Sequence, residues 1–103
     1  MPVIEVKVLP LGTAEASIAS YIEECYDIAH SAAGVTCILT PTSTVLEGEL
    51  EDLLPVVEAM HRSPFSSGVE RVVTTITIDD RLDKDLDMDS MVESVLSTDI
   101  LDE

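Results

Sequence analysis

The stretch RVVTTITIDDR, residues 71–81, has the composition of a β-strand that runs into charged residues. Valine, isoleucine and threonine are branched at Cβ, and such residues favour extended backbone. Side chains alternate between the two faces of a strand, and the more apolar of the two sets here is Val72, Thr74, Ile76 and Ile78. The other set is Val73, Thr75 and Thr77. We therefore predict a strand over residues 69–78, with the first set in the core.

The same periodicity predicts the elements that precede this strand. Apolar residues alternate in three further predicted strands, at 3–9, 35–40 and 44–48. They recur at three- and four-residue spacing in two predicted helices, at 14–33 and 50–63.

The ends of both helices carry recognisable signals. Thr13 or Ser17 is expected to cap the first helix, and Gly34 to follow its end. The second helix contains Pro55, which is expected in its first turn behind a Glu51 or Asp52 cap. Pro64 is expected to end or kink that helix.

The element order is βαββαβ, and a last helix is predicted at about 88–98 behind an Asp87 or Asp89 cap. Strand-helix-strand crossovers are right-handed, so two such units give a four-stranded antiparallel sheet with both helices on one face. The predicted fold is a single α+β, ferredoxin-like sandwich over residues 1–103 with a C-terminal helix. Its other sheet face is left bare, and we expect this face to pair with a second copy by sheet stacking.

The charge of the chain narrows the classes of partner. The 103 residues include 21 acids and 5 bases, for a formal net charge of −16. Such a surface repels phosphate, so nucleic acid and anionic membranes are excluded, whereas cations or basic proteins are attracted. Solubility or a high-salt habitat also accounts for the acidity. No signal peptide or membrane-spanning run is recognised, so a cytoplasmic protein is expected.

Acidic residues alternate in DKDLDMD, residues 83–89, and this suggests a calcium loop. An EF-hand requires glycine at its sixth position and glutamate at its twelfth. Counted from Asp83, those positions hold Met88 and Ser94, and the register that starts at Asp85 fails in the same way. A solvated acidic loop before a helix N-terminus is the better interpretation.

The histidines and cysteines, which could bind a metal or act as nucleophiles, do not form a recognisable motif. His30 and His61 lie near predicted helix ends, without the spacing of a zinc site. Cys25 and Cys37 are expected to be reduced and buried. No catalytic motif is present, so we predict no metal, no cofactor and no enzyme activity.

Glu47 is unusual because it lies inside a short predicted strand, TVLEG. A covered carboxylate needs a partner. It is either a solvated glutamate at the sheet edge, or a carboxylate on the bare face that a dimer partner shields, where it accepts a hydrogen bond from a ligand ring nitrogen or offsets a cation.

Four segments together resemble the small thiamine-binding protein family. They are PLGT, Ser17 with Tyr21-Ile22, STVLEG, and GVERVVTTITIDDR followed by DK. The similarity extends from about residue 3 to residue 96. The resemblance implies a ferredoxin-like fold, dimers that pair into tetramers, and binding of thiamine or its hydroxymethylpyrimidine part without catalysis.

The resemblance also implies a set of ligand-binding candidates. Glu47 is expected to face the pyrimidine, and Thr44 and Ser43 to supply hydroxyl groups. The remaining candidates are Thr13, Ser17, Asp79 and Asp80. The alternative function is a structural or regulatory homo-oligomeric module without a small-molecule ligand.

Overall fold

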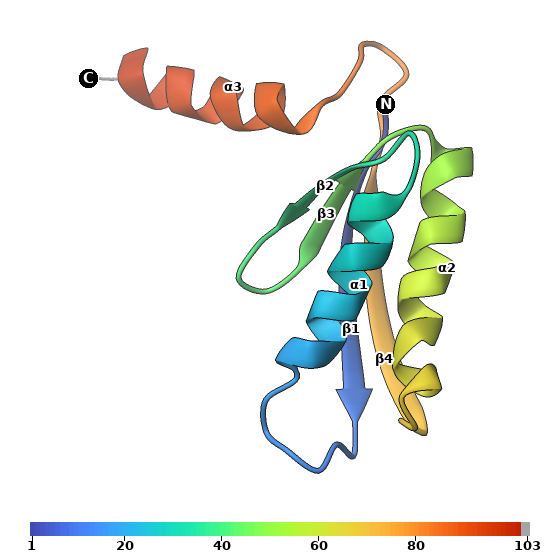
Figure 1. The fold of residues 1–103 in the computed structure, drawn as a ribbon. Coiled ribbons are helices and arrows are strands. Elements are labelled where there is room, and N and C mark those ends of the chain that lie inside the picture. The colour runs from blue at the N-terminus through green and yellow to red at the C-terminus, as the bar shows by residue number, and fades with distance from the viewer. Residues whose placement is uncertain (102–103) are drawn as a thin grey trace.

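The computed structural model describes residues 1–101, and residues 102 and 103 of the predicted domain lie outside this part (Figure 1). The elements are β1 (Val3–Leu11), α1 (Ala19–Ser31), β2 (Thr36–Leu39), β3 (Thr44–Glu47), α2 (Leu50–Ser66), β4 (Arg71–Asp79) and α3 (Met88–Leu101). Their order confirms the predicted βαββαβ arrangement with a C-terminal helix.

The four strands form one antiparallel sheet in the order β2-β3-β1-β4. Helices α1 and α2 lie side by side on one face, and the structure has the predicted ferredoxin-like fold (Figure 1). We call the sheet face that these helices cover the helix face, and the core lies between it and the two helices. Its buried side chains are Ile4, Val6, Val8 and Leu46 from the sheet, Cys25 and Ala29 from α1, and Leu53, Val56, Val57 and Met60 from α2.

Helix α1 begins at Ala19 rather than at the predicted residue 14. The Thr13 hydroxyl donates to the carbonyl oxygen of Glu15 at 2.7 Å, and this local turn competes with helix. Burial of the α1 stripe also begins only at Ile18, so the preceding residues gain nothing from the core.

Helix α2 corrects the predicted roles of both prolines. The N-cap is Glu49, so Pro55 lies in the second turn rather than the first. The helix continues through Pro64 to Ser66, three residues beyond the predicted end. Five of its side chains are buried, and their packing offsets the backbone hydrogen bonds that the two prolines lack.

The register of β4 confirms the predicted division of its faces. Thr74 pairs with Val8 and Ile78 with Ile4, on the helix face. The helices cover this face of β4 incompletely, however, because the side chains of Ile76 and Ile78 remain 44% and 48% exposed. Helix α2 contacts the first half of β4 through His61, whose Nδ1 lies 2.7 Å from Thr74 Oγ1.

Residues 80–87 cross one end of the bare sheet face before α3 begins. Leu86 and Met88 are buried there against Val3. Of the two predicted caps, Asp87 and Asp89, the structure confirms Asp87. Its carboxylate accepts a hydrogen bond from the Ser90 N–H at 2.7 Å. From this anchor α3 extends away from the rest of the molecule (Figure 1).

Candidate functional site

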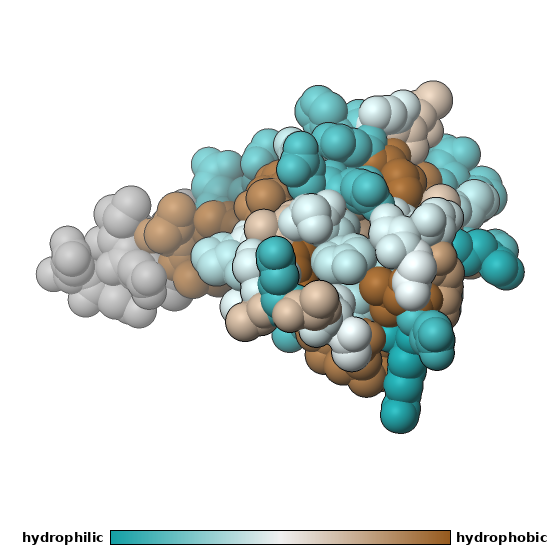
Figure 2. All heavy atoms as spheres, turned by 60° about the horizontal axis from the view of Figure 1, so that its bottom comes forward, coloured by the Kyte–Doolittle hydropathy of each residue, from teal (hydrophilic) through white to brown (hydrophobic). Residues whose placement is uncertain are grey.

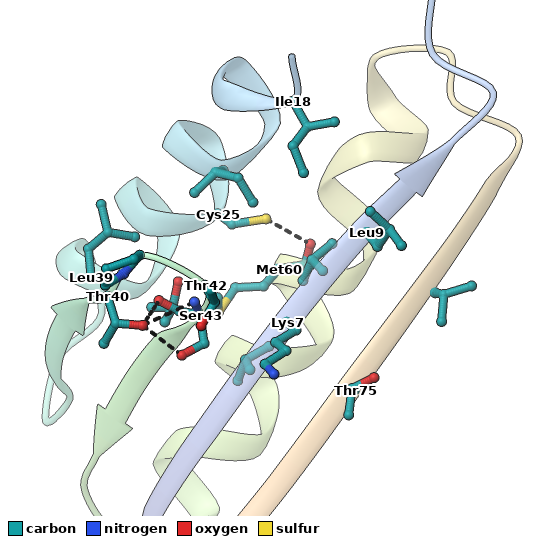
Figure 3. Close-up of a pocket in the computed structure, with 16 residues that line it drawn as sticks. Lys7, Leu9, Ile18, Cys25, Leu39, Thr40, Thr42, Ser43, Met60 and Thr75 are labelled. Atoms are coloured by element: carbon teal, nitrogen blue, oxygen red, sulfur yellow. Dashed lines mark hydrogen bonds between the residues drawn. The ribbon is translucent and has the colours of Figure 1, made fainter. Parts of the chain in front are cut away.

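The sheet has a notch beside β1. Strand β3 pairs with β1 only from Val3 to Val6, whereas β4 pairs with β1 as far as Leu11. From Lys7 onward, β1 therefore has a neighbouring strand on one side only. A pocket of about 480 Å³ occupies this notch, between β1, the start of α1 and the hairpin tip at residues 40–43 (Figure 3).

Both faces of the sheet contribute to this pocket, which we call the notch pocket. From the helix side its apolar wall consists of Val6, Val8, Ile18, Ile22, Cys25 and Met60. From the bare side it is lined by Lys7, Leu9, Val73 and Thr75. The hairpin adds Leu39, Thr40, Pro41, Thr42, Ser43 and Thr44. Its size and its mixture of apolar walls and hydroxyl groups are typical of small-molecule sites.

Two of the hairpin hydroxyl groups are bonded to each other. Thr40 Oγ1 lies 2.8 Å from Ser43 Oγ and also accepts from the Ser43 N–H at 3.0 Å. Thr44 is 4% exposed, and within residues 1–101 its hydroxyl has no hydrogen bond. The Thr44 hydroxyl is thus one of the unbonded hydroxyl groups that the described residues place in the pocket wall, together with those of Thr42 and Thr75.

The main chain of Val8 also faces the notch. The carbonyl oxygen of Pro2 accepts from the Gly48 N–H at 3.3 Å, so Pro2 directs its main chain toward the β3 side. Main-chain direction alternates along a strand, and Val8 therefore directs its N–H and C=O to the same side, beyond the end of β3. Pro10, the next residue of this series, has no N–H.

Charge in the notch pocket is sparse. Lys7 is its one charged lining residue, and its Nζ lies 3.8 Å from a Glu5 oxygen. The Cys25 thiol donates to the Met60 carbonyl oxygen at 3.4 Å. Burial, with a smaller contribution from Glu24, raises the pKa of Cys25 to about 11. The thiol therefore stays protonated at neutral pH and is a poor nucleophile.

Among the predicted ligand-binding residues, Ser43 and Thr44 line the notch pocket, but Glu47 does not. Glu47 Oε2 instead accepts a hydrogen bond from the backbone N–H of Met88 at 2.6 Å. The Glu47 side chain is half-buried, and the group that contacts its carboxylate is the start of α3.

Thr13 and Ser17 lie in the segment that precedes α1. Thr13 lines a second, more open hollow together with Tyr21 and Arg71, outside the notch pocket. Ser17 accepts from the Ala19 N–H at 3.4 Å through its exposed hydroxyl. Neither residue is the N-cap of α1, which is Ile18.

Asp79 and Asp80 lie at the exposed end of β4. Asp79 pairs with Val3, whereas the notch begins beyond Val6, so these acids are separated from the pocket by several positions along the sheet. The structure therefore does not bring them together with Ser43 and Thr44.

Sequence patterns did not reveal Lys7, Val8, Cys25 or Thr42 as pocket residues. The pocket could have been predicted from a difference in strand length, because a four-residue β3 cannot pair with all nine residues of β1.

No group of three or more potential metal ligands occurs within the described residues. None of the helices in this part of the chain is long and apolar enough to cross a membrane.

The sequence matches the profile of a family described as thiamine-binding proteins over residues 4–96. The chain belongs to this family of small ferredoxin-like proteins.

Two relatives and one solved structure illustrate the similarity. UPF0045 protein YqgV of Bacillus subtilis is 41% identical, over 92% of this chain and 94% of the relative. A UPF0045 protein of Methanothermobacter thermautotrophicus is 38% identical, over 88% and 92%. The crystal structure of hypothetical protein MJ1052 from Methanocaldococcus jannaschii matches with a TM-score of 0.82 at 29% identity, over 91% of this chain and 94% of that one.

Proposed function

We propose that the protein binds thiamine, or the free hydroxymethylpyrimidine that forms part of it, in the notch pocket and performs no catalysis. The observation that carries this proposal is that the free main-chain edge of Val8 and the unbonded hydroxyl of Thr44 line the same pocket. Membership of the thiamine-binding family supports the ligand class.

The aminopyrimidine ring complements this edge. It offers a ring nitrogen that accepts and an adjacent amino group that donates. The Val8 N–H would donate to the ring nitrogen, and the Val8 carbonyl oxygen would accept from the amino group. The ring would thus take the place of one residue of the missing strand, with Thr44 as a further partner and Ile22 and Met60 as apolar walls.

Electrostatics favour the pyrimidine over the thiazolium ring inside the pocket. Lys7 repels a cation at close range, and no acidic residue lines the notch. The net charge of −16 attracts the cation over longer distances. We therefore expect thiamine to bind through its pyrimidine, with the thiazolium ring held at the mouth toward solvent.

Titration calorimetry with hydroxymethylpyrimidine and with thiamine tests the proposal. Heat of binding is expected for both, and the analogue without the amino group should bind at least tenfold more weakly. Absence of heat and of any thermal shift at millimolar ligand would rule out this function.

Two variants of Val8 test whether its main-chain N–H contacts the ligand. Val8→Pro removes the N–H, and Pro10 shows that the strand accepts proline on this side. We expect Val8→Pro to lose at least tenfold in affinity, whereas Val8→Ala keeps the N–H and most of the binding. Equal affinity of the two variants, both folded by circular dichroism, would remove Val8 from the recognition.

A second candidate function is a homo-oligomeric module without a ligand. The observation that favours it is the bare sheet face, on which Leu9, Ile38 and Val73 are 46%, 43% and 44% exposed. Under this alternative the oligomer persists in solution while neither thiamine nor hydroxymethylpyrimidine binds.

A further inference from the structure

The notch pocket differs in charge from the rest of the molecule. Acidic residues occupy 21 of the 103 positions, yet none of those that the structure describes lines this pocket. Lys7, one of the two lysines of the chain, does line it. On a molecule of net charge −16 the pocket is therefore locally basic, and it favours a ligand that carries negative charge.

The polar groups of this pocket suit a ligand that is rich in acceptor oxygens. The Val8 N–H and the Lys7 ammonium only donate hydrogen bonds, and the hydroxyl groups of Thr42, Thr44 and Thr75 are able to donate. Among the described residues, the pocket lining includes no carboxylate, carboxamide or imidazole side chain. A phosphate monoester complements such a lining, because near neutral pH it carries about −1.5 to −2 charges and three strong acceptor oxygens.

Lys7 and Thr75 lie side by side on the bare face, where they line the pocket. They are partners in the antiparallel register of β1 and β4, so their side chains project from the same face of the sheet (Figure 3). Side chains in directly opposite positions have Cβ atoms about 4.5–5.5 Å apart, which lets an ammonium and a hydroxyl group contact one phosphate. The Lys7 side chain is 50% exposed, and its ion pair with Glu5 at 3.8 Å is weak because both groups are solvated.

We propose that the preferred ligand of the notch pocket is the phosphorylated pyrimidine, a phosphate ester of its hydroxymethyl group, with Lys7 and Thr75 as the phosphate-binding residues. This inference rests on the proposed function, because the ring bound at Val8 positions the ester. The pocket is lined from both faces of the sheet, so a ring at the main-chain edge of Val8 has the bare face beside it. The flexible four-carbon stem of Lys7 lets its ammonium meet the phosphate there.

The net charge of −16 does not prevent this contact. At an ionic strength of about 0.15 M the Debye length is about 8 Å, so the charges of distant acids are largely screened. Glu5, which is not in the pocket lining, contacts Lys7 and competes with the phosphate for its ammonium. Glu5→Gln should therefore tighten binding of the ester about twofold, and weaker binding by this variant would contradict the proposed contact.

Titration calorimetry with three probes tests the ligand class: hydroxymethylpyrimidine, its phosphate ester and inorganic phosphate. The ester should bind about tenfold more tightly than the alcohol, because it adds a charge-assisted contact with Lys7. Inorganic phosphate lacks the ring, and it should bind about a hundredfold more weakly than the ester.

The three probes separate failure of this inference from failure of the proposed function. An alcohol that binds as tightly as its ester would overturn the inference and leave the proposed function standing. Inorganic phosphate that binds as tightly as the ester would overturn the inference as well, because the ring would then contribute nothing. Absence of binding by both the alcohol and the ester would overturn the proposed function and this inference with it.

Two lysine variants with the same change in charge test the role of Lys7. Lys7→Gln should lower the ratio of the alcohol Kd to the ester Kd about fivefold, whereas Lys84→Gln, outside the pocket, should leave this ratio unchanged. Lys7→Gln should also bind thiamine more tightly, because it relieves repulsion of the thiazolium cation, and damage to the pocket would not produce such a gain. Equal ratios in the two variants, or weaker thiamine binding by Lys7→Gln, would overturn the proposal.

Discussion

Glu47 and Met88 are joined by a 2.6 Å hydrogen bond from the Met88 backbone N–H to the Glu47 carboxylate, across 41 positions of the chain. The bond connects the end of β3 to the first turn of α3. A carboxylate at a helix N-terminus also interacts favourably with the helix dipole. Glu47 is therefore a docking residue for the C-terminal segment.

Replacing Glu47 with alanine is expected to release this segment while the sheet stays folded. A hydrogen bond to a charged group contributes about 1.5–3 kcal/mol, and partial exposure places this one at the lower end. Hydrogen exchange of the Met88 amide should become faster in Glu47→Ala, and Glu47→Gln should show an intermediate rate. An unchanged Met88 exchange rate would show that the bond does not hold α3.

Thr44→Val is expected to weaken pyrimidine binding without loss of stability. The Thr44 hydroxyl has no partner among the described residues, so its removal breaks no hydrogen bond within them. The lost ligand contact corresponds to about 1 kcal/mol, or roughly a fivefold change in Kd by calorimetry. Thr36→Val is the control, because Thr36 is exposed and lies outside the notch pocket.

Gly48→Ala should be one of the more damaging small substitutions. A Cβ at Gly48 would lie 2.6 Å from the Gly34 carbonyl oxygen and 3.2 Å from Leu53 Cδ2, so the backbone would have to move. We expect a loss of about 3 kcal/mol in the free energy of unfolding. Gly12→Ala is the comparison: its φ is +71° and it has open space around it, so only about 1 kcal/mol should be lost. A larger effect at Gly12 would contradict this ranking.

The Cys25 thiol should react slowly in the folded protein. Its pKa is raised from 9.0 to about 11, so the thiolate fraction at pH 8 falls about a hundredfold relative to the unfolded chain. Because the folded state holds the proton more tightly, this contribution to stability is complete below pH 9 and is lost as pH rises toward 11. Alkylation followed by mass spectrometry gives the rate, and a fast reaction of native Cys25 at pH 8 would contradict the burial. Bound ligand should slow it further, because Cys25 lines the notch pocket.

The acidic surface should make stability depend on salt. The four ion pairs found among the described residues all have exposed side chains, and such pairs offset little of the repulsion. We expect Tm to rise between about 10 mM and about 1 M sodium chloride, as screening shortens the Debye length from about 30 to about 3 Å. A flat Tm across this range would show that self-repulsion does not limit stability.

Local periodicity was sufficient to predict the element order and the two faces of β4. It was insufficient for boundaries that depend on tertiary contacts, such as the late start of α1 and the passage of α2 through Pro64. The burial of Leu86 was missed for the same reason, since its contact with Val3 spans almost the whole chain.

The candidate site was only partly predictable. Ser43 and Thr44 were identified by resemblance and lie in the pocket, but the partner of Glu47 is 41 residues away and leaves no trace in local sequence. Val8 could not be predicted from side-chain chemistry, because the ligand contact proposed for it uses its main chain.

The early end of β3 has a consequence for cooperativity. The hairpin tip is held mainly by the Thr40–Ser43 hydrogen bonds and not by β1, so it is able to open independently of the core. A ligand that contacts both Val8 and the tip residues of the notch pocket would fasten the tip to β1 and merge two cooperative units into one. Binding and hairpin closure are then linked equilibria, and a substitution that tightens the hairpin should raise affinity without touching the ligand.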